Sequence, residues 1–267
     1  MTTTASTPPL VHSDNLKAPG PGRLLREGRA PWELAALAAA SPWWSRLLPA
    51  GDGHPVIVLP GLGANDFTTA PLRRFLRRRG YAPHPWRQGF NFGPHRGRAG
   101  GVLDACAALL RSTVEQHGRP ASLVGWSLGG VYARELAKQM PAQVRCVITL
   151  GSPFAGHPRA TNAWRFFELV SGQSVHDDAL IAELRRPPPL PTTSIYSKSD
   201  GIVAWQCCVN DEAAHLQTEN IEVPASHLGM GANPVALYAI ADRLAQPLGA
   251  WQRFARSGLR RWFYPGA

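Results

Sequence analysis

The sequence predicts an α/β fold, with a mostly parallel sheet of about six strands and helices on both faces. First, short apolar runs alternate along the chain with stretches of helical periodicity, and such alternation favours parallel strands. Second, a Gly-x-Ser-x-Gly motif lies between one of these runs and a helical stretch. Third, an aspartate and a histidine each follow one of the last two apolar runs. Together these observations predict one α/β domain over residues 54–246.

The composition indicates a globular and basic protein. Of its 267 residues, 44% are apolar and 17% are charged, which suits a packed domain rather than a disordered chain. The 28 lysines and arginines exceed the 18 acidic residues by ten. No nucleic-acid motif accompanies this charge, so no nucleic-acid partner is expected. The charge indicates either an ordinary solvated surface or peripheral contact with an anionic membrane.

The sequence also bears on compartment and cofactors. It lacks the features of a secretory signal and has no apolar stretch long enough to span a membrane. We therefore expect a cytoplasmic protein, with peripheral attachment to a membrane as the alternative. The four cysteines show neither a disulfide framework nor the spacing of a zinc site: Cys106, Cys146, Cys207 and Cys208. No metal and no cofactor are expected.

Two segments of different character precede the domain. Residues 1–30 are rich in Thr, Pro, Gly and Ser and are expected to form a flexible tail. Residues 31–53 are expected to be a helical segment, because Pro31 suits the first position of a helix. The Ser-Pro-Trp-Trp stretch at 41–44 is expected to end that helix. The helix either packs on the domain or lies in a membrane interface.

The strands and helices of the domain follow from apolar continuity and helical periodicity. The expected strands, in chain order, are 55–60, 81–86, 121–124, 144–150, 192–197 and 220–223. The expected helices are 70–79, 103–117, 131–140 and 234–245. The first of these helices carries several arginines on the face away from its leucines, which favours a solvated outer surface.

Two further segments break this regular alternation. Residues 154–191 hold Trp164, Phe166 and Phe167 and follow a strand of the sheet. They are expected to form a small helical cap or lid over the carboxyl edge of the sheet, where ligands bind in such folds. Residues 247–267 mix arginine with aromatic side chains. On a helix these aromatics would share one face, which either packs on the domain or meets lipid.

The Gly-x-Ser-x-Gly motif spans residues 125–129 and indicates a nucleophile elbow, because it joins a strand to a helix. So tight a turn crowds the positions two residues before and after the serine, and Gly125 and Gly129 relieve that crowding. Ser127 is thereby raised above the sheet at the start of a helix, whose free N–H groups favour negative charge. Trp126 is expected to line the substrate pocket. The alternative is a glycine-rich turn that only packs a strand against a helix.

A serine nucleophile needs a base, and that base needs an orienting group. Asp200 follows the strand 192–197, and His227 follows the strand 220–223. The order serine, acid, histidine at strand ends is the order that this motif requires. Rival acids and histidines lie elsewhere in the pattern: Asp177, Asp178, Asp211, His157 and His215. The alternative is that Asp200 and His227 are ordinary loop residues.

Two backbone N–H groups are expected to stabilise the oxyanion. Leu128 directly follows the candidate nucleophile, and Leu62 lies in the loop after the first strand. Gly61 and Gly63 flank Leu62 and would let its backbone approach the substrate. The alternative is a glycine turn without a catalytic task.

The elbow, the glycine loop and the late acid and histidine together resemble the α/β-hydrolase superfamily, in its bacterial lipase- and esterase-like branch. Many of those lipases carry His-Gly-x where this chain has Leu-Pro-Gly-Leu-Gly at 59–63. Pro60 thus replaces the histidine but leaves the Leu62 donor in place. The Leu-Gly-Ser-Pro stretch at 150–153 is also similar to that branch. The resemblance covers roughly residues 54–245.

This resemblance implies a serine carboxyl-ester hydrolase that works through an acyl-enzyme, without metal or cofactor. The aromatic residues of the expected cap favour a small-molecule or lipid ester with an apolar acyl or aryl group. One alternative is an acyltransferase, which would use the same triad but resolve the acyl-enzyme with an alcohol. The other is a non-catalytic, membrane-associated binding protein on this fold.

Overall fold

The computed structural model describes residues 16–94, 101–156, 160–164, 168 and 178–265. A parallel six-stranded sheet forms its centre, in the order β2-β1-β3-β4-β5-β6. The strands are β1 (Pro55–Leu59), β2 (Ala82–Pro85), β3 (Ala121–Trp126), β4 (Val144–Leu150), β5 (Thr192–Tyr196) and β6 (Thr218–Glu222). The predicted α/β fold is confirmed.

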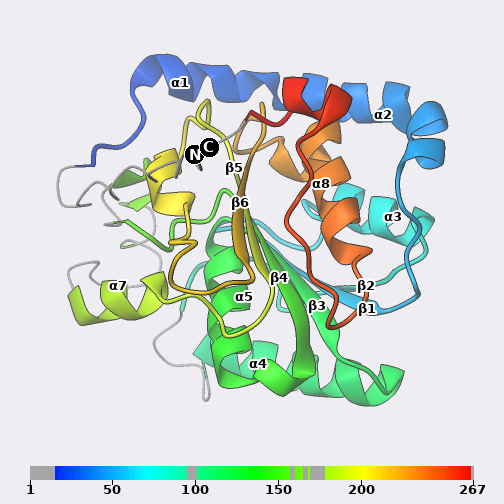
Figure 1. Cartoon of the computed structure of the whole chain (residues 1–267). Coiled ribbons are helices and arrows are strands. Elements are labelled where there is room, and N and C mark those ends of the chain that lie inside the picture. The colour runs from blue at the N-terminus through cyan, green and yellow to red at the C-terminus, as the bar shows by residue number, and fades with distance from the viewer. Residues whose placement is uncertain (1–15, 95–100, 157–159, 165–167, 169–177, 266–267) are drawn as a thin grey trace, which may run out of the picture.

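Helices cover both faces of this sheet (Figure 1). α3 (Ala70–Arg78) and α8 (Pro234–Leu244) pack on one face, whereas α4 (Gly101–His117) and α5 (Leu128–Gln139) pack on the other. Alternate residues of β1 enter the two cores, because side chains alternate along a strand. Every residue of β1 is therefore buried, which explains its unbroken apolar sequence.

The remaining elements are shorter or lie at the edges. They are α1 (Pro21–Leu25), η2 (Arg26–Arg29), α2 (Ala30–Leu47), η3 (Pro141–Gln143), α7 (Asp178–Arg185), η5 (Trp205–Cys208), η6 (Met230–Ala232) and η7 (Gly258–Trp262). α7 lies within the segment predicted as a cap. Within the described ranges, no helix has both the length and the apolar character that crossing a membrane demands.

The N-terminal segment differs from its prediction. Residues 21–30 are helical, so the expected flexible tail over residues 1–30 is wrong for that part. α1, η2 and α2 form a nearly continuous run along one side of the molecule (Figure 1). The cause is tertiary, because Glu27 is buried against two loops of the domain. α2 also continues past Pro42 to Leu47, beyond the expected end at 41–44.

The C-terminal segment is mostly irregular, and part of it packs on the domain. Residues 251–257 have no regular structure, and Gly258, at φ 63°, begins the short η7. Phe254 and Tyr264 are buried in the core beside α8, where the Tyr264 hydroxyl donates to the Val235 carbonyl over 2.7 Å. The aromatic side chains that follow Gly258 are divided between this core and the solvent.

Candidate active site

Ser127 occupies the turn between β3 and α5 in a strained backbone conformation. Its φ is 51° and its ψ is −122°, and a positive φ is costly for a residue that carries a side chain. Two hydrogen bonds hold this geometry. The Ser127 N–H donates to the Leu150 carbonyl over 2.8 Å, and its carbonyl accepts from the Gly130 N–H over 2.9 Å. The surrounding sheet and helix thus maintain the strain.

The two glycines of the elbow have no room for a side chain. A Cβ on Gly125 would lie 2.3 Å from the Gly130 Cα, and one on Gly129 would lie 2.3 Å from the Leu59 carbonyl oxygen. Both distances are far inside van der Waals contact. Gly129 therefore lets α5 start directly against the end of β1, and Gly125 lets the turn close on itself.

Asp200 and His227 lie in contact at the carboxyl edge of the sheet. The Nδ1 of His227 is 2.7 Å from Oδ2 of Asp200, and both side chains are buried. The other oxygen of Asp200, Oδ1, accepts from the N–H groups of Ile202 and Val203, each over 2.8 Å. These bonds fix the orientation of the carboxylate. Because Oδ2 accepts a hydrogen bond from Nδ1–H of His227, Nε2 is left as the basic nitrogen of the ring.

The electrostatic surroundings favour the protonated form of His227. Burial alone would lower the pKa of this imidazole, since it removes the charged form from water. The charge of Asp200, its hydrogen bond and the charge of Glu27 outweigh burial, so the pKa of His227 is raised. Such an imidazole is suited to accept a proton from a neighbouring hydroxyl.

The histidine loop lies against the elbow. The indole N–H of Trp126 donates to the His227 carbonyl over 3.0 Å. A Cβ on Gly151, the residue after Leu150, would lie 3.0 Å from the His227 Nδ1. Since Leu150 also accepts from the Ser127 N–H, Ser127 and His227 are brought to the same edge of the sheet. Trp126 anchors this loop, and its place in the substrate pocket stays a prediction.

Leu128 belongs to the elbow, and the loop that carries Leu62 lies beside the elbow. A Cβ on Gly61 would lie 3.1 Å from the Ser127 Cβ, so the glycine loop adjoins the serine. Leu128 begins α5, where helical N–H groups have no intrahelical partner. Neither N–H has an acceptor among the residues that the structure describes. Both are therefore available to an oxyanion.

Asn91 supports the glycine loop, and sequence analysis missed it. Its fully buried side chain donates to the Pro60 carbonyl over 2.8 Å. Its backbone carbonyl accepts from the Gly63 N–H over 2.7 Å. Bonds on both sides of Leu62 thus hold the loop. The only signal in the sequence was a polar residue in a loop at the carboxyl end of an expected strand.

Glu27 and Glu33 reach the histidine loop from the N-terminal segment. Glu27 accepts from the backbone N–H groups of His227 and Leu228, and Glu33 accepts from that of Ser226. Sequence analysis placed residue 27 in a tail and residue 33 on an ordinary helix. No motif marks either glutamate, so the contacts become apparent only in the folded chain.

The other candidates are dispersed. Trp164 is half-buried, whereas Phe166 and Phe167 of the expected cap lie outside the described residues, as do Asp177 and His157. Asp178 begins α7. Asp211 accepts from the Ala213 N–H in an exposed turn, and His215 accepts from the Gln217 N–H. Neither Asp211 nor His215 makes a hydrogen bond to the elbow.

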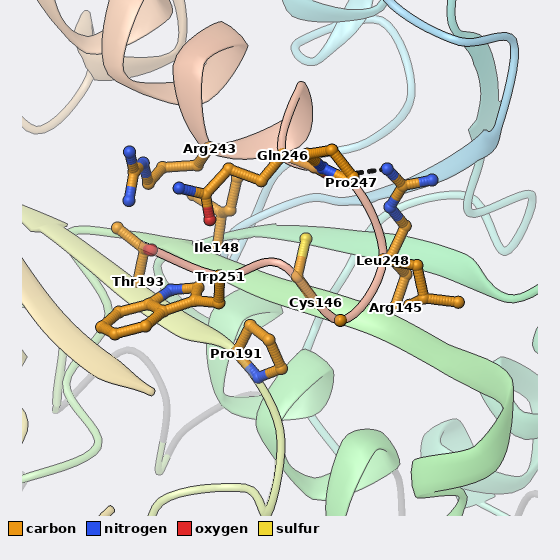
Figure 2. Close-up of a pocket in the computed structure, with 11 residues that line it drawn as sticks. Arg145, Cys146, Ile148, Pro191, Thr193, Arg243, Gln246, Pro247, Leu248 and Trp251 are labelled. Carbon is orange, nitrogen blue, oxygen red and sulfur yellow. Dashed lines mark hydrogen bonds between the residues drawn. The ribbon is translucent and has the colours of Figure 1, made fainter. Parts of the chain in front are cut away.

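The pocket in Figure 2 is separate from this site. It lies at the amino-terminal half of β4 and β5, under the loop that follows α8, and Cys146, Thr193 and Trp251 contribute to its walls. Its volume is about 30 Å³, which leaves room for only a few water molecules. Ser127 lies beyond the other end of the strands.

The fold and this site define the class of protein. The chain belongs to the alpha/beta hydrolase family, whose sequence pattern matches residues 40–267. Within it, the chain is similar to the pimeloyl-[acyl-carrier protein] methyl ester esterase of Shewanella woodyi, with 31% identity over 116 residues. That match covers 43% of this chain and 42% of the esterase, so it spans less than half of either protein.

Solved structures of other proteins share the fold. Lipase B of Aspergillus fumigatus superimposes with a TM-score of 0.56 and 17% identity, over 74% of this chain and 54% of the lipase. An esterase of Pyrococcus furiosus gives 0.55 and 14%, over 74% of this chain and 85% of the esterase. At these identities the likeness concerns architecture, and chemistry has to be argued from the site.

Proposed function

We propose that this protein is a serine carboxyl-ester hydrolase acting through an acyl-enzyme. The observation that carries the proposal is the buried Asp200–His227 pair, whose 2.7 Å contact lies at the same sheet edge as the strained Ser127 turn. Structural proteins rarely maintain backbone strain without a reason, and strain of this kind gathers at functional sites. The partial sequence match to an esterase supports the same reaction class.

The proposed reaction follows from these groups. The Ser127 hydroxyl attacks the ester carbonyl carbon and gives its proton to Nε2 of His227, while the N–H groups of Leu62 and Leu128 stabilise the oxyanion. The tetrahedral intermediate collapses, the bond to the alcohol oxygen breaks, and His227 protonates the departing alcohol. Water then attacks the acyl carbonyl carbon and gives a proton to His227. The bond between that carbon and Ser127 Oγ breaks, His227 returns the proton to Oγ, and the carboxylic acid leaves.

An apolar acyl or aryl ester is the proposed substrate. Leu228, next to the histidine, is 53% exposed, and Leu62 and Leu128 are half-buried beside the serine. These side chains present apolar surface around the reacting groups, which suits an apolar chain.

Labelling with a fluorophosphonate tests the proposal. The probe phosphonylates only an activated serine, so wild type should label while Ser127→Ala and His227→Ala should not. Ser112→Ala, which removes an exposed hydroxyl on α4, is the matched control and should label like wild type. A panel of esters with increasing chain length would then define the acyl group.

The outcomes also separate the alternatives. If products partition to an added alcohol rather than to water, the protein is an acyltransferase with the same triad. If folded wild type does not label, even with detergent present to open a cap, the hydrolase proposal is wrong. The non-catalytic binding protein would then be the better account.

A further inference from the structure

Glu27 is a buried carboxylate that binds the backbone of two separate loops. Its side chain is 6% exposed. Oε1 accepts from the N–H of Gly201 over 2.8 Å and from that of His227 over 3.0 Å. Oε2 accepts from the N–H of Leu228 over 2.9 Å. One carboxylate therefore joins the loop after β5 to the loop after β6.

A second glutamate strengthens the same attachment. Oε1 and Oε2 of Glu33 accept from the N–H and the hydroxyl of Ser226, each over 2.8 Å. Arg29 pairs with Glu33 over 3.2 Å and donates to the Ser199 hydroxyl over 2.6 Å. The N-terminal segment thus contacts the residues immediately before both Asp200 and His227. These contacts come from a part of the chain that precedes the central sheet.

We propose that Glu27 is a positioning residue for His227, which holds the acid and histidine loops in register and stabilises the imidazolium formed during catalysis. The inference rests on the proposed function, because it concerns the same reaction. Asp200 and His227 lie on loops of different strands, and their side chains meet over a single hydrogen bond. Bonds to both backbones from one rigid carboxylate limit how far that contact can open.

Charge distinguishes Glu27 from a residue that only fills space. Burying an ionised carboxylate is costly unless its oxygens are satisfied, and here backbone N–H groups satisfy them. No lysine or arginine forms an ion pair with Glu27 within the described ranges, and backbone N–H groups are its partners instead. That charge raises the pKa of His227 together with Asp200, against the opposing effect of burial. The neighbouring Arg29 and Glu33 form an ion pair, so their opposite charges largely cancel at His227.

Two substitutions of Glu27 separate the effect of its charge from the effect of its side-chain length. Glu27→Gln keeps the shape but removes the charge and turns one acceptor into a donor that faces an N–H. We expect kcat to fall roughly ten- to one-hundred-fold with KM little changed. The acid limb of the kcat/KM profile should move to lower pH, because the imidazolium loses a stabilising charge. Glu27→Asp keeps the charge but is one methylene shorter, so kcat should fall while the acid limb stays near its wild-type position.

Glu115→Gln is the matched control, since it removes the same charge from an exposed position of α4. It should leave kcat and the pH profile unchanged. If Glu27→Gln folds and has the kcat and acid limb of wild type, the inference is overturned. If Glu27→Gln fails to fold, as judged by thermal unfolding, an unchanged kcat in Glu27→Asp would overturn it instead.

NMR titration of the His227 imidazole separates this inference from the proposed function. The titration reports the pKa of His227 whether or not the protein turns over an ester. If wild type neither labels nor hydrolyses esters, the proposed function fails, and the Glu27 contact is then judged from this titration alone. An equal pKa of His227 in wild type and Glu27→Gln would contradict the inference even in an active enzyme.

Discussion

At the scale of single residues, the two oxygens of Asp200 have different tasks. Oδ1 accepts from two backbone N–H groups, and Oδ2 faces the histidine. In Asp200→Asn the amide oxygen would keep the two backbone bonds, so the amide nitrogen would face Nδ1 of His227. Because the amide nitrogen donates, Nδ1 would have to accept the hydrogen bond. The histidine proton would then move to Nε2, the nitrogen that must act as the base. We expect kcat to fall by about 10³- to 10⁴-fold.

Steady-state kinetics of purified Asp200→Asn would check this prediction, with Asp211→Asn as the matched control. Asp211 only accepts from the Ala213 N–H in an exposed turn, so its substitution should leave kcat within a factor of two or so of wild type. Equal activity in the two variants would contradict the assignment of Asp200 as the acid.

Asp200 and Glu27 show which candidate site residues a sequence can reveal. Asp200 could be predicted because the carboxyl end of a strand fixes where its loop lies, and the strand was visible as an apolar run. Glu27 contacts partners 174 and 200 residues further along the chain. Its surrounding sequence has no apolar periodicity, and a buried glutamate bound by backbone N–H groups has no local pattern. Only tertiary structure brings these groups together.

At the scale of elements, the elbow tests how tightly β3 and α5 are joined. Gly125→Ala and Gly129→Ala would each place a methyl group about 2.3 Å from backbone atoms that cannot turn aside. We expect each substitution to lower the free energy of unfolding by about 3 kcal/mol or more, or to prevent folding. Denaturant titration would measure it.

Gly28→Ala is the control for these variants. A Cβ at Gly28 would meet nothing within 4 Å, and the residue lies in η2. Alanine there should be neutral or slightly stabilising, because it restricts the unfolded chain. A folded Gly129→Ala with wild-type stability would show that α5 is not packed against β1 as described.

A buried histidine joins two strands at the end of the sheet far from Ser127. His54, before β1, bonds the Ser122 hydroxyl of β3 over 2.8 Å and also bonds Asp52. Burial lowers the pKa of His54 to about 4. The hydrogen bond to Asp52 raises this pKa, and the charge of Arg145 lowers it further. The histidine is therefore neutral in the folded protein near pH 6.

Acid should therefore weaken the fold through His54. The pKa of His54 is near 6.5 in the unfolded chain and about 4 in the folded protein. Between these pH values the unfolded chain binds one more proton than the folded protein does. The free energy of unfolding therefore falls as the pH falls, by at most about 1.4 kcal/mol per pH unit. The raised pKa of His227 acts oppositely, since its contribution is complete at low pH and is lost on the alkaline side. Urea unfolding at pH 7 and pH 5 should show a smaller loss in His54→Gln than in wild type. Equal losses would exclude His54 as the cause.

The sequence could predict the helices and strands that pack into the hydrophobic core. The strands other than β2 were visible because their side chains are mostly buried on both faces of the sheet, and the helices on the sheet were visible from their helical periodicity. The path of the C-terminal segment could not be predicted, since several of its residues bond to distant parts of the chain. Phe254 donates its N–H to Glu219, and Gln252 accepts from Arg243. Those bonds favour an irregular path over a helix.

At the scale of the whole molecule, a positive charge of ten coincides with exposed aromatic side chains near the C-terminus. Leu259, Trp262 and Phe263 are 80%, 74% and 55% exposed, and Arg260 and Arg261 lie between them in sequence. Tryptophan and arginine together are typical of surfaces that meet an anionic lipid interface. Peripheral membrane contact therefore stays a prediction, and the exposed Trp262 and Phe263 are the side chains at which to test it.

Deleting the C-terminal segment would be a poor test, because Phe254 and Tyr264 belong to the core and their loss would unfold the domain. The double variant Trp262→Ala, Phe263→Ala leaves that core intact. We expect it to partition about ten-fold less onto anionic vesicles than wild type does, measured by co-sedimentation. Leu216→Ala, which removes another exposed apolar side chain, should bind like wild type. Binding should weaken at high salt, since screening shortens the reach of the arginine charges. Equal binding to zwitterionic and anionic vesicles, or an unchanged double variant, would show that the basic aromatic end of the chain is only a solvated surface.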